Sequence, residues 1–429
     1  MPGTPRLALE TWETTTLNQR HPPAHFHTAI TLSWRTAAMR LRTYRPGKHW
    51  LLIAFFLTLC PTGGCKQSSW PLWNAYQTRF IDPQGRVIDH SAADRTTSEG
   101  QAYALFFALV DNDRPTFDRM LSWTQANLAN NDLQAHLPAW LWGKSNDGQW
   151  KTLDSHSASD ADLWMAYTLI EAGRLWHVPH YTASGQAMMA LISKTEVANL
   201  PGLGPMLLPG PTGFQRNQTT TLNPSYMPLF LFQRLAKVDP QGPWQQIAQG
   251  IPRLLEGSAR HGFVMDWVNY IPGDGFYPTP AMQTGNPDSD VPGGSYDAIR
   301  VYLWAGMIDG SSSLRAQVLS AIPAMSVYLA SHDAPPEKIS DQGIPLAQDG
   351  PVGFSAAVLP YLRAFPDASA SMSSAKQTVR VARMRDASTE LYGKDLAYYD
   401  QNLALFSTGF IEGRFRFGAN GELNVEWNR

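Results

Sequence analysis

Cysteine and charge are both scarce in this chain of 429 residues. Its only two cysteines, Cys60 and Cys65, stand close together near the N-terminus, so a domain that begins after them has no internal disulfide. Charged residues make up 16% of the sequence and the net charge is −2, which gives no electrostatic case for nucleic-acid binding. The apolar segment 51–59 is too short to span a bilayer, so we expect no transmembrane anchor in the mature protein.

The N-terminal part has the features of an export signal. Basic residues at 40–48 precede the apolar segment 51–59, and the small and turn-forming residues 61–64 follow it. Residues 1–65 hold seven lysines and arginines but two acids, which leaves 27 basic and 34 acidic residues in the rest. We interpret residues 1–65 as an N-terminal extension and signal segment of a secreted protein, with Met39 as an alternative start. Residues 66–429 are then the mature domain.

Two interpretations of Cys65 stay open. It follows Gly63-Gly64, so it is a candidate lipid anchor at the mature N-terminus. Thr62, however, stands three residues before it, where a bacterial lipobox prefers Leu. The alternative is an incidental cysteine beside a soluble cleavage site.

Helical periodicity dominates the mature domain. In segment 98–110, three aromatic residues and Val110 follow the i, i+3, i+4, i+7 spacing of one helix face. Strand-like alternation is limited to 415–424 and short pieces around 262–268, and no repeat is visible. We therefore expect an all-α protein. The expected helices are 98–110, 115–127, 160–176, 184–199, 223–238, 243–258, 297–308, 313–331, 352–365, 373–391 and 398–413.

Long segments rich in Gly, Pro, Asn, Asp and Trp separate several of these helices. Loops of this length in a compact domain are usually functional or disordered, and disordered segments are poor in aromatic residues. Because these segments contain several tryptophans, we expect ordered loops that form a substrate cleft. They are 128–159, 200–222, 270–295 and 331–351.

Three expected helices begin with a carboxylate in an aromatic-rich setting: Glu99, Asp160 and Asp297. Taken singly, each acid is explained by the helix dipole, or for Asp297 by a surface pair with Arg300. Taken together they indicate a sugar-cleaving site. Glycoside hydrolysis uses a pair of carboxylates around one bond, and aromatic faces suit sugar rings.

The same position creates a conflict for Glu99. A general acid needs a raised pKa, whereas a helix N-terminus lowers the pKa of a carboxyl group. Glu99 therefore works as an acid only if a dry pocket and neighbouring carboxylates outweigh the dipole. We expect no metal and no cofactor, because the Asp160-x-Asp162 pair lacks the Gly and Glu of a calcium loop and the histidines show no metal spacing.

The run 158–176, Ala-Ser-Asp-Ala-Asp-Leu-Trp-Met-Ala-Tyr-Thr-Leu-Ile-Glu-Ala-Gly-Arg-Leu-Trp, resembles the signature of family 8 glycoside hydrolases. Thr168 stands where Ser or Ala is usual. Segment 97–101 resembles the general-acid segment of that family, and 295–300 resembles its general-base segment. The resemblance covers about residues 70–410 and implies an (α/α)6 barrel that cleaves β-1,4-glycosidic bonds with inversion.

The resemblance also implies a role for each acid. Glu99 would protonate the leaving glycosidic oxygen, Asp297 would deprotonate the attacking water, and Asp160 would hold the central sugar and the water. An inverting enzyme needs the acid and base carboxyls roughly 6.5–9.5 Å apart to admit that water.

Five further residues are candidates for substrate binding. Trp140 and Trp142 lie in an expected loop, where they are suited to stack on glucose rings. Tyr226 and Tyr296 match subsite positions of the family. Arg300 is suited to donate to sugar hydroxyls or to orient the base.

More narrowly, segments 70–73 and 85–89 resemble the periplasmic endoglucanases of bacterial cellulose-synthesis operons. This implies a periplasmic cellulase that acts on β-1,4-glucan and that supports the cellulose synthase and export complex. Two alternatives stay open: a xylanase or chitosanase of the same family, and a noncatalytic glycan-binding component of a synthase complex.

Overall fold

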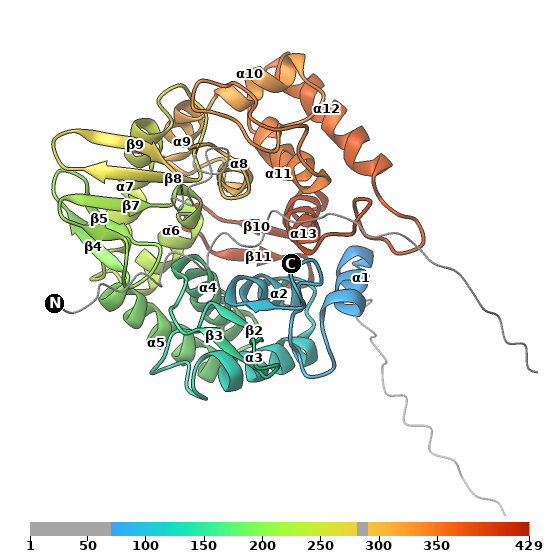
Figure 1. Cartoon of the computed structure of the whole chain (residues 1–429). Coiled ribbons are helices and arrows are strands. Elements are labelled where there is room, and N and C mark those ends of the chain that lie inside the picture. Colours follow the sequence, from blue (N-terminus) through green and yellow to red (C-terminus); the bar gives the residue numbers. More distant parts are fainter. Residues whose placement is uncertain (1–69, 281–290, 429) are drawn as a thin grey trace, which may run out of the picture. The chain divides into compact units, whose positions relative to one another are not determined.

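A computed structural model describes residues 70–280 and 291–428 (Figure 1). These residues belong to one compact unit. The predicted signal segment, the alternative start at Met39 and the candidate anchor Cys65 lie outside the described residues. In the part of the chain that is described, no helix has both the length and the apolar character needed to cross a membrane.

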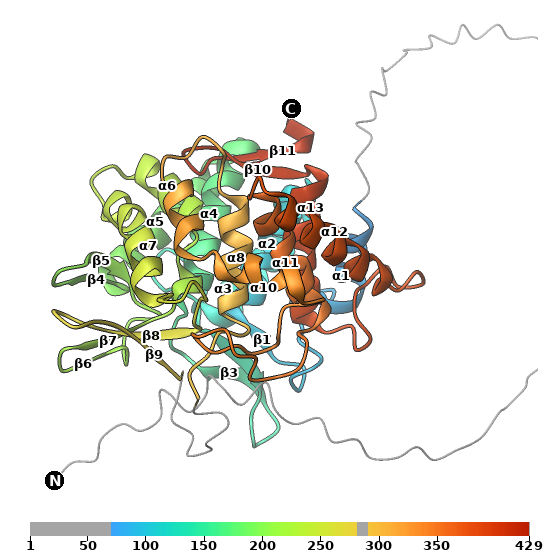
Figure 2. The ribbon, with the colours of Figure 1, turned by 90° about the horizontal axis from the view of Figure 1, so that it is seen from above.

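Among the described residues, six helices form an inner ring, and each packs against an outer helix (Figures 1 and 2). Inner helices are buried on most sides, whereas outer helices bury one face. The inner helices are α2 (Ser98–Val110), α4 (Ser159–Leu175), α6 (Leu229–Val238), α8 (Ala298–Met307), α11 (Val352–Arg363) and α13 (Tyr398–Glu412). Their outer partners, in the same order, are α3 (Arg114–Leu128), α5 (Pro179–Thr195), α7 (Trp244–Ser258), α9 (Arg315–Ala321), α12 (Ala368–Arg383) and α1 (Pro71–Phe80), with α10 (Ala324–Ser331) beside α12. This confirms the predicted (α/α)6 barrel.

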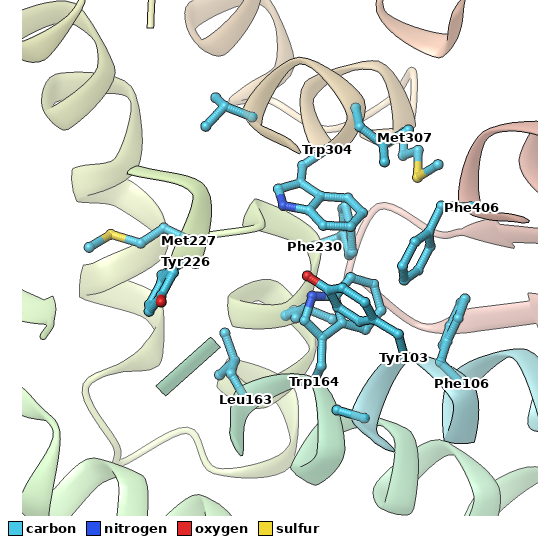
Figure 3. Close-up of a cluster of buried hydrophobic side chains, with 14 of the residues drawn as sticks. Tyr103, Phe106, Leu163, Trp164, Tyr226, Met227, Phe230, Trp304, Met307 and Phe406 are labelled. Carbon is cyan, nitrogen blue, oxygen red and sulfur yellow. The ribbon is translucent and has the colours of Figure 1, made fainter. Parts of the chain in front are cut away.

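Aromatic side chains from the inner helices fill the centre of the ring (Figure 3). Phe406 of α13 lies 5.0 Å from the rings of both Trp164 and Trp304, and Phe230 of α6 packs edge-on against Trp304 at 6.2 Å. A hairpin of β10 (Phe415–Phe417) and β11 (Leu423–Val425) closes one end, where Phe417 stacks on Phe230 at 3.8 Å. Burying a large apolar side chain contributes about 2 kcal/mol, so this centre holds the inner helices in register.

The other end of the ring carries short antiparallel sheets (Figure 2). One consists of β1 (Thr96–Thr97), β2 (Leu141–Lys144) and β3 (Trp150–Asp154). Another consists of β6 (Gln215–Arg216), β7 (Thr219–Leu222), β8 (Trp267–Ile271) and β9 (Gly275–Thr279), and β4 (Val197–Leu200) pairs with β5 (Gly204–Leu207).

Most of these strands lie in segments that we expected to be loops, so the prediction of sparse strands was wrong there. Each strand has two to five residues, which is too short for a clear alternation of polar and apolar positions. Several pair with partners far along the chain, as β1 does with β2 and β7 with β8. The predicted strand alternation at 415–424 is confirmed by the β10–β11 hairpin.

Proline accounts for the main differences in helix bounds. The expected helix 223–238 is broken at Pro228 into the 3-10 turn η1 (Pro224–Tyr226) and α6. The expected helix 313–331 is likewise broken at Pro323 into α9 and α10, because proline has no N–H to donate and disfavours a helical residue before it. Helix α12 begins at Ala368, earlier than expected, since Asp367 caps it by accepting from Ala370 N at 2.8 Å.

Candidate active site

The three predicted acids meet at the guanidinium of Arg300. Glu99 lies in the first turn of α2, Asp160 in the first turn of α4, and Asp297 immediately before α8. Arg300 lies in the first turn of α8 and is 2% exposed. Its Nη1 donates to Glu99 Oε2 and, at 3.0 Å, to Asp160 Oδ2, while its Nη2 donates to Asp297 Oδ1. Carboxylates far apart in sequence thus form one cluster around a single buried cation, which we call the Arg300 cluster.

The three carboxylates differ in exposure. The side chains of Glu99 and Asp297 are 22% and 25% exposed, whereas that of Asp160 is 5% exposed. The two outer acids therefore open to solvent at the end of the ring that carries the sheets, and Asp160 lies beneath them. This arrangement suits two groups that exchange protons with a ligand and a third that fixes their positions.

Helix capping does not explain the acids at 99 and 297. The cap of α2 is Thr97, whose Oγ1 accepts from Gly100 N at 3.2 Å, and this leaves the Glu99 side chain for Arg300. Asp297 makes no capping hydrogen bond to its own helix. Asp160 does bond to local backbone, because its Oδ1 accepts from Ala161 N at 2.8 Å, but its second oxygen faces Arg300.

Burial gives Glu99 the raised pKa that a general acid needs, although Glu99 lies at a helix N-terminus. Burial raises the pKa of Glu99 to about 7, and the nearby Asp160 and Asp297 carboxylates add to the rise. Arg300 and Arg95 act in the opposite direction without outweighing these effects. Burial also raises the pKa of Asp160, against the effect of Arg300. Glu99 therefore retains its proton close to neutral pH, as a general acid requires.

Arg300, one of the five candidate binding residues, is the centre of the cluster, and two others lie near it. The ring of Tyr226, from η1, lies 5.6 Å from the Arg300 guanidinium carbon and packs edge-on against Trp267 at 6.1 Å. Trp140 borders the start of α2, since its backbone oxygen accepts from Ser98 N at 3.0 Å.

Tyr296 and Trp142 have other contacts. Tyr296 precedes Asp297, but its hydroxyl donates to Glu337 Oε1 at 2.7 Å, so its ring supports the loop after α10. Trp142 stacks on Trp150 with ring centroids 5.1 Å apart and packs edge-on against Trp123 at 5.4 Å. One face of Trp142 is therefore already covered by a neighbouring ring.

Sequence reasoning missed two residues that hold Arg300. Tyr103 Oη accepts from Nη1 and Ser225 Oγ accepts from Nη2, each at 3.0 Å. Tyr103 had a signal, because it stands one turn after Glu99 on the same helix face. Ser225 is itself held by Asn223, whose Oδ1 accepts from the Ser225 hydroxyl at 2.7 Å, and no local pattern linked it to α8.

The acids of the cluster surround a cation that the protein itself supplies. Over residues 70–280 and 291–428, no group of three or more His, Cys, Asp and Glu side chains is arranged to hold a metal ion. The cluster itself supplies three carboxyl groups that are suited to acid–base chemistry.

A second carboxyl pair lies buried behind Asp160. Asp162 and Glu196 are both fully buried, and Ser157 Oγ donates to Glu196 Oε1 at 2.6 Å. Among the described residues, no salt bridge reaches either acid. Burial raises the pKa of Asp162 well above its usual range, with Glu196 adding to the rise, and it raises the pKa of Glu196 to about 7.

Glu196→Gln is expected to remove part of the pH dependence of stability. A carboxyl group with a raised folded-state pKa binds its proton more tightly in the folded protein, so stability falls as pH rises from about 4.5 through about 7. The shift corresponds to roughly 3 kcal/mol at most. Chemical denaturation at pH 5 and pH 8 should show a smaller loss for Glu196→Gln than for wild type. The exposed Glu256→Gln should behave as wild type, and an equal loss in all three would contradict the assignment.

Comparisons with known proteins agree with this geometry. Residues 55–412 match the glycosyl hydrolases family 8. The endoglucanase of Xanthomonas axonopodis pv. citri (strain 306) is 47% identical over 359 residues, which cover 83% of this chain and 89% of that protein. The endoglucanase of Escherichia coli (strain K12) is 42% identical over 362 residues, which cover 84% and 92%.

A solved structure supports the same relationship. The endo-1,4-D-glucanase from Vibrio fischeri ES114 is similar to this chain with a TM-score of 0.75 and 36% identity, over 84% of this chain and 100% of that one. The family match spans the helix starts that carry Glu99, Asp160 and Asp297. Sequence, barrel and acid cluster together show that this chain is a glycoside hydrolase and belongs to glycosyl hydrolases family 8.

Proposed function

We propose that this protein is an endo-β-1,4-glucanase that hydrolyses cellulose-type β-1,4-glucan with inversion. The observation that carries the proposal is the Arg300 cluster, in which two partly exposed acids flank a buried cation above a third, buried acid. Relatives that cover most of this chain at 42–47% identity bear the name endoglucanase. No cofactor is needed for the reaction.

In the proposed mechanism, Glu99 donates its proton to the leaving glycosidic oxygen. Its pKa of about 7 keeps a proton available near neutral pH and still allows the proton to leave. Asp297 accepts a proton from the water that attacks the anomeric carbon from the opposite face. The C–O bond to the leaving sugar breaks as the bond to water forms, so no covalent sugar–enzyme intermediate arises.

The buried members of the cluster serve this exchange. Asp160 is proposed to hold the central sugar and the attacking water from below, with Arg300 keeping its charge balanced. Arg300 also fixes Asp297, because its second nitrogen donates to that carboxylate. A fixed base removes the entropic cost of orienting it in each turnover.

The aromatic candidates are proposed to bind sugar rings along the cleft. Tyr226 lies against Arg300, and Trp140 lies beside the start of α2, so both are close to the proposed cleavage point. Trp142 is proposed to act further along β2, next to Arg86, whose guanidinium carbon lies 4.4 Å from the Trp142 ring centroid. Tyr296 is proposed to shape the cleft by anchoring the Glu337 loop.

The proposed cellular setting is the bacterial periplasm, in support of cellulose synthesis and export. Two observations favour it: the basic and apolar signal-like segment before Cys65, and the similarity of segments 70–73 and 85–89 to periplasmic endoglucanases of cellulose operons. Residues 66–429 are proposed to act as one secreted catalytic domain, either soluble or held by a lipid at Cys65.

A polymer panel tests the proposed function. Purified protein is expected to release reducing ends from carboxymethylcellulose faster than from xylan or chitosan. Faster release from either of those polymers would replace the glucanase proposal with the same-family alternative. Binding to cellulose without hydrolysis would favour the noncatalytic component. Proton NMR of fresh product should show the α-anomer first, and a first β-anomer would contradict inversion.

A further inference from the structure

Asp266 is a fourth carboxylate beside the Arg300 cluster, and the mechanism above does not use it. It lies directly before β8, a strand of the sheet that borders the site. Its Oδ1 accepts two backbone hydrogen bonds at 2.7 Å, from Ser295 N and from Ala298 N. These N–H groups lie on either side of Asp297, so one side chain holds the segment that carries the proposed base.

The start of α8 explains why this contact is needed. Asp297 occupies the cap position with helical angles, φ −78° and ψ −51°, and makes no capping hydrogen bond. An aspartate can instead bend onto the N–H of the residue that follows it, as Asp160 does in this protein. Asp266 takes the Ala298 N–H instead, and the Asp297 carboxylate is directed to Arg300.

The charges around Asp266 fit this arrangement. Burial raises the pKa of Asp266 to about 7 and Asp297 adds to the rise, while the two backbone N–H groups and Lys338 act against it. The charge of Asp266 also contributes to raising the pKa of Tyr399, which lies on α13. Keeping two acids side by side carries an electrostatic cost, which a purely structural cap would avoid by using Ser, Thr or Asn.

We propose that Asp266 is the positioning residue of the base: it caps α8 in place of Asp297 and so keeps the Asp297 carboxylate on Arg300 and facing the cleft. This inference rests on the proposed function, in which Asp297 is the base. It assigns Asp266 no contact with substrate.

The test compares two substitutions at this position. Asp266→Ala removes the cap, so Asp297 is expected to fold back onto α8, and kcat on carboxymethylcellulose should fall about 10–100-fold with KM little changed. Asp266→Asn keeps an acceptor oxygen for both N–H groups, and kcat should stay within about threefold of wild type. A crystal structure of Asp266→Ala should show the contact between Asp297 and Arg300 lost.

A matched control separates positioning from stability. Asp367 caps α12 in the outer ring through a single hydrogen bond to Ala370 N. Asp367→Ala should lower the melting temperature without changing kcat. If Asp266→Ala does not fold, Asp266→Glu, which keeps the charge but displaces the oxygen, should still lower kcat about tenfold.

Three outcomes would overturn the inference. They are unchanged kcat in Asp266→Ala, unchanged kcat in Asp266→Glu, and an equal loss in Asp266→Ala and Asp266→Asn. Each of these outcomes applies only if the wild-type protein is active. Inactive wild type on every polymer would instead contradict the proposed function itself, so the two failures are distinguishable.

Discussion

Glu99→Gln is expected to lower kcat on carboxymethylcellulose by about 10³-fold or more. A cellulose hydroxyl is a poor leaving group, and positioned proton donation supplies about 10²–10⁴-fold in rate. Glutamine has nearly the same shape and can still accept from Arg300, but it cannot give up a proton. Initial rates over a range of polymer concentrations should therefore show the loss in kcat, with KM within a few-fold of wild type.

The leaving group gives this prediction a sharper form. A cello-oligosaccharide with a dinitrophenyl leaving group needs no protonation, so Glu99→Gln should hydrolyse it at close to the wild-type rate. On polymer, wild-type activity should decline as pH rises through about 7, where Glu99 loses its proton. Glu256→Gln, exposed on α7, serves as the control, and circular dichroism checks the fold. Full polymer activity in Glu99→Gln would remove Glu99 from the mechanism.

The inner helices were predicted well because the signals that start and maintain a helix lie within the helix itself or next to it in the sequence. Helix α2 runs over Ser98–Val110, as expected, since a capping Thr, a first-turn acid and an unbroken apolar run all agree. The same agreement placed Glu99 and Asp160 at helix starts. The effect of proline was underestimated. Pro228 and Pro323 each interrupt a segment that periodicity alone predicted to be one continuous helix.

The sheets and the interior of the site depend on contacts between distant segments. Strand β7 pairs with β8, although α6 and α7 lie between them in the sequence. The four residues of β7 contain no pattern from which β8 could be predicted as its partner. Asp266 and Ser225 share this property, because their partners in the Ser295–Arg300 segment come from another element. Arg300 was recognised as a neighbour of Asp297, but no sequence pattern indicated that it also binds Glu99 and Asp160.

Arg300→Met is expected to produce the second large effect, on stability and activity together. Arg300 is 2% exposed, and its guanidinium donates to three carboxylates, Tyr103 and Ser225. Methionine fills similar volume but leaves the acids facing one another without a cation. Breaking a buried ion pair by removing one partner costs about 3–5 kcal/mol, and kcat should fall about 10³-fold as the acids reorganise.

The pH dependence of this loss distinguishes charge from packing. Without the cation, the cluster can fold only if its carboxyl groups take up protons, so the destabilisation of Arg300→Met should be smaller at pH 5 than at pH 8. Urea denaturation at the two pH values measures the difference. A loss that is equal at both would assign Arg300 to packing alone.

Two further variants test whether the geometry of Arg300 matters as well as its charge. Arg300→Lys restores a cation. An ammonium has a single nitrogen, so it cannot bind Glu99 and Asp160 through one nitrogen and Asp297 through a second, as the guanidinium does. This variant should therefore recover stability at pH 8 more fully than kcat. Arg234→Met removes a partly buried arginine, 15% exposed, from Glu171 in the inner ring, where Arg174 remains as a partner. That variant should lose stability and keep kcat. Equal recovery of stability and kcat in Arg300→Lys would show that a positive charge alone organises the three acids.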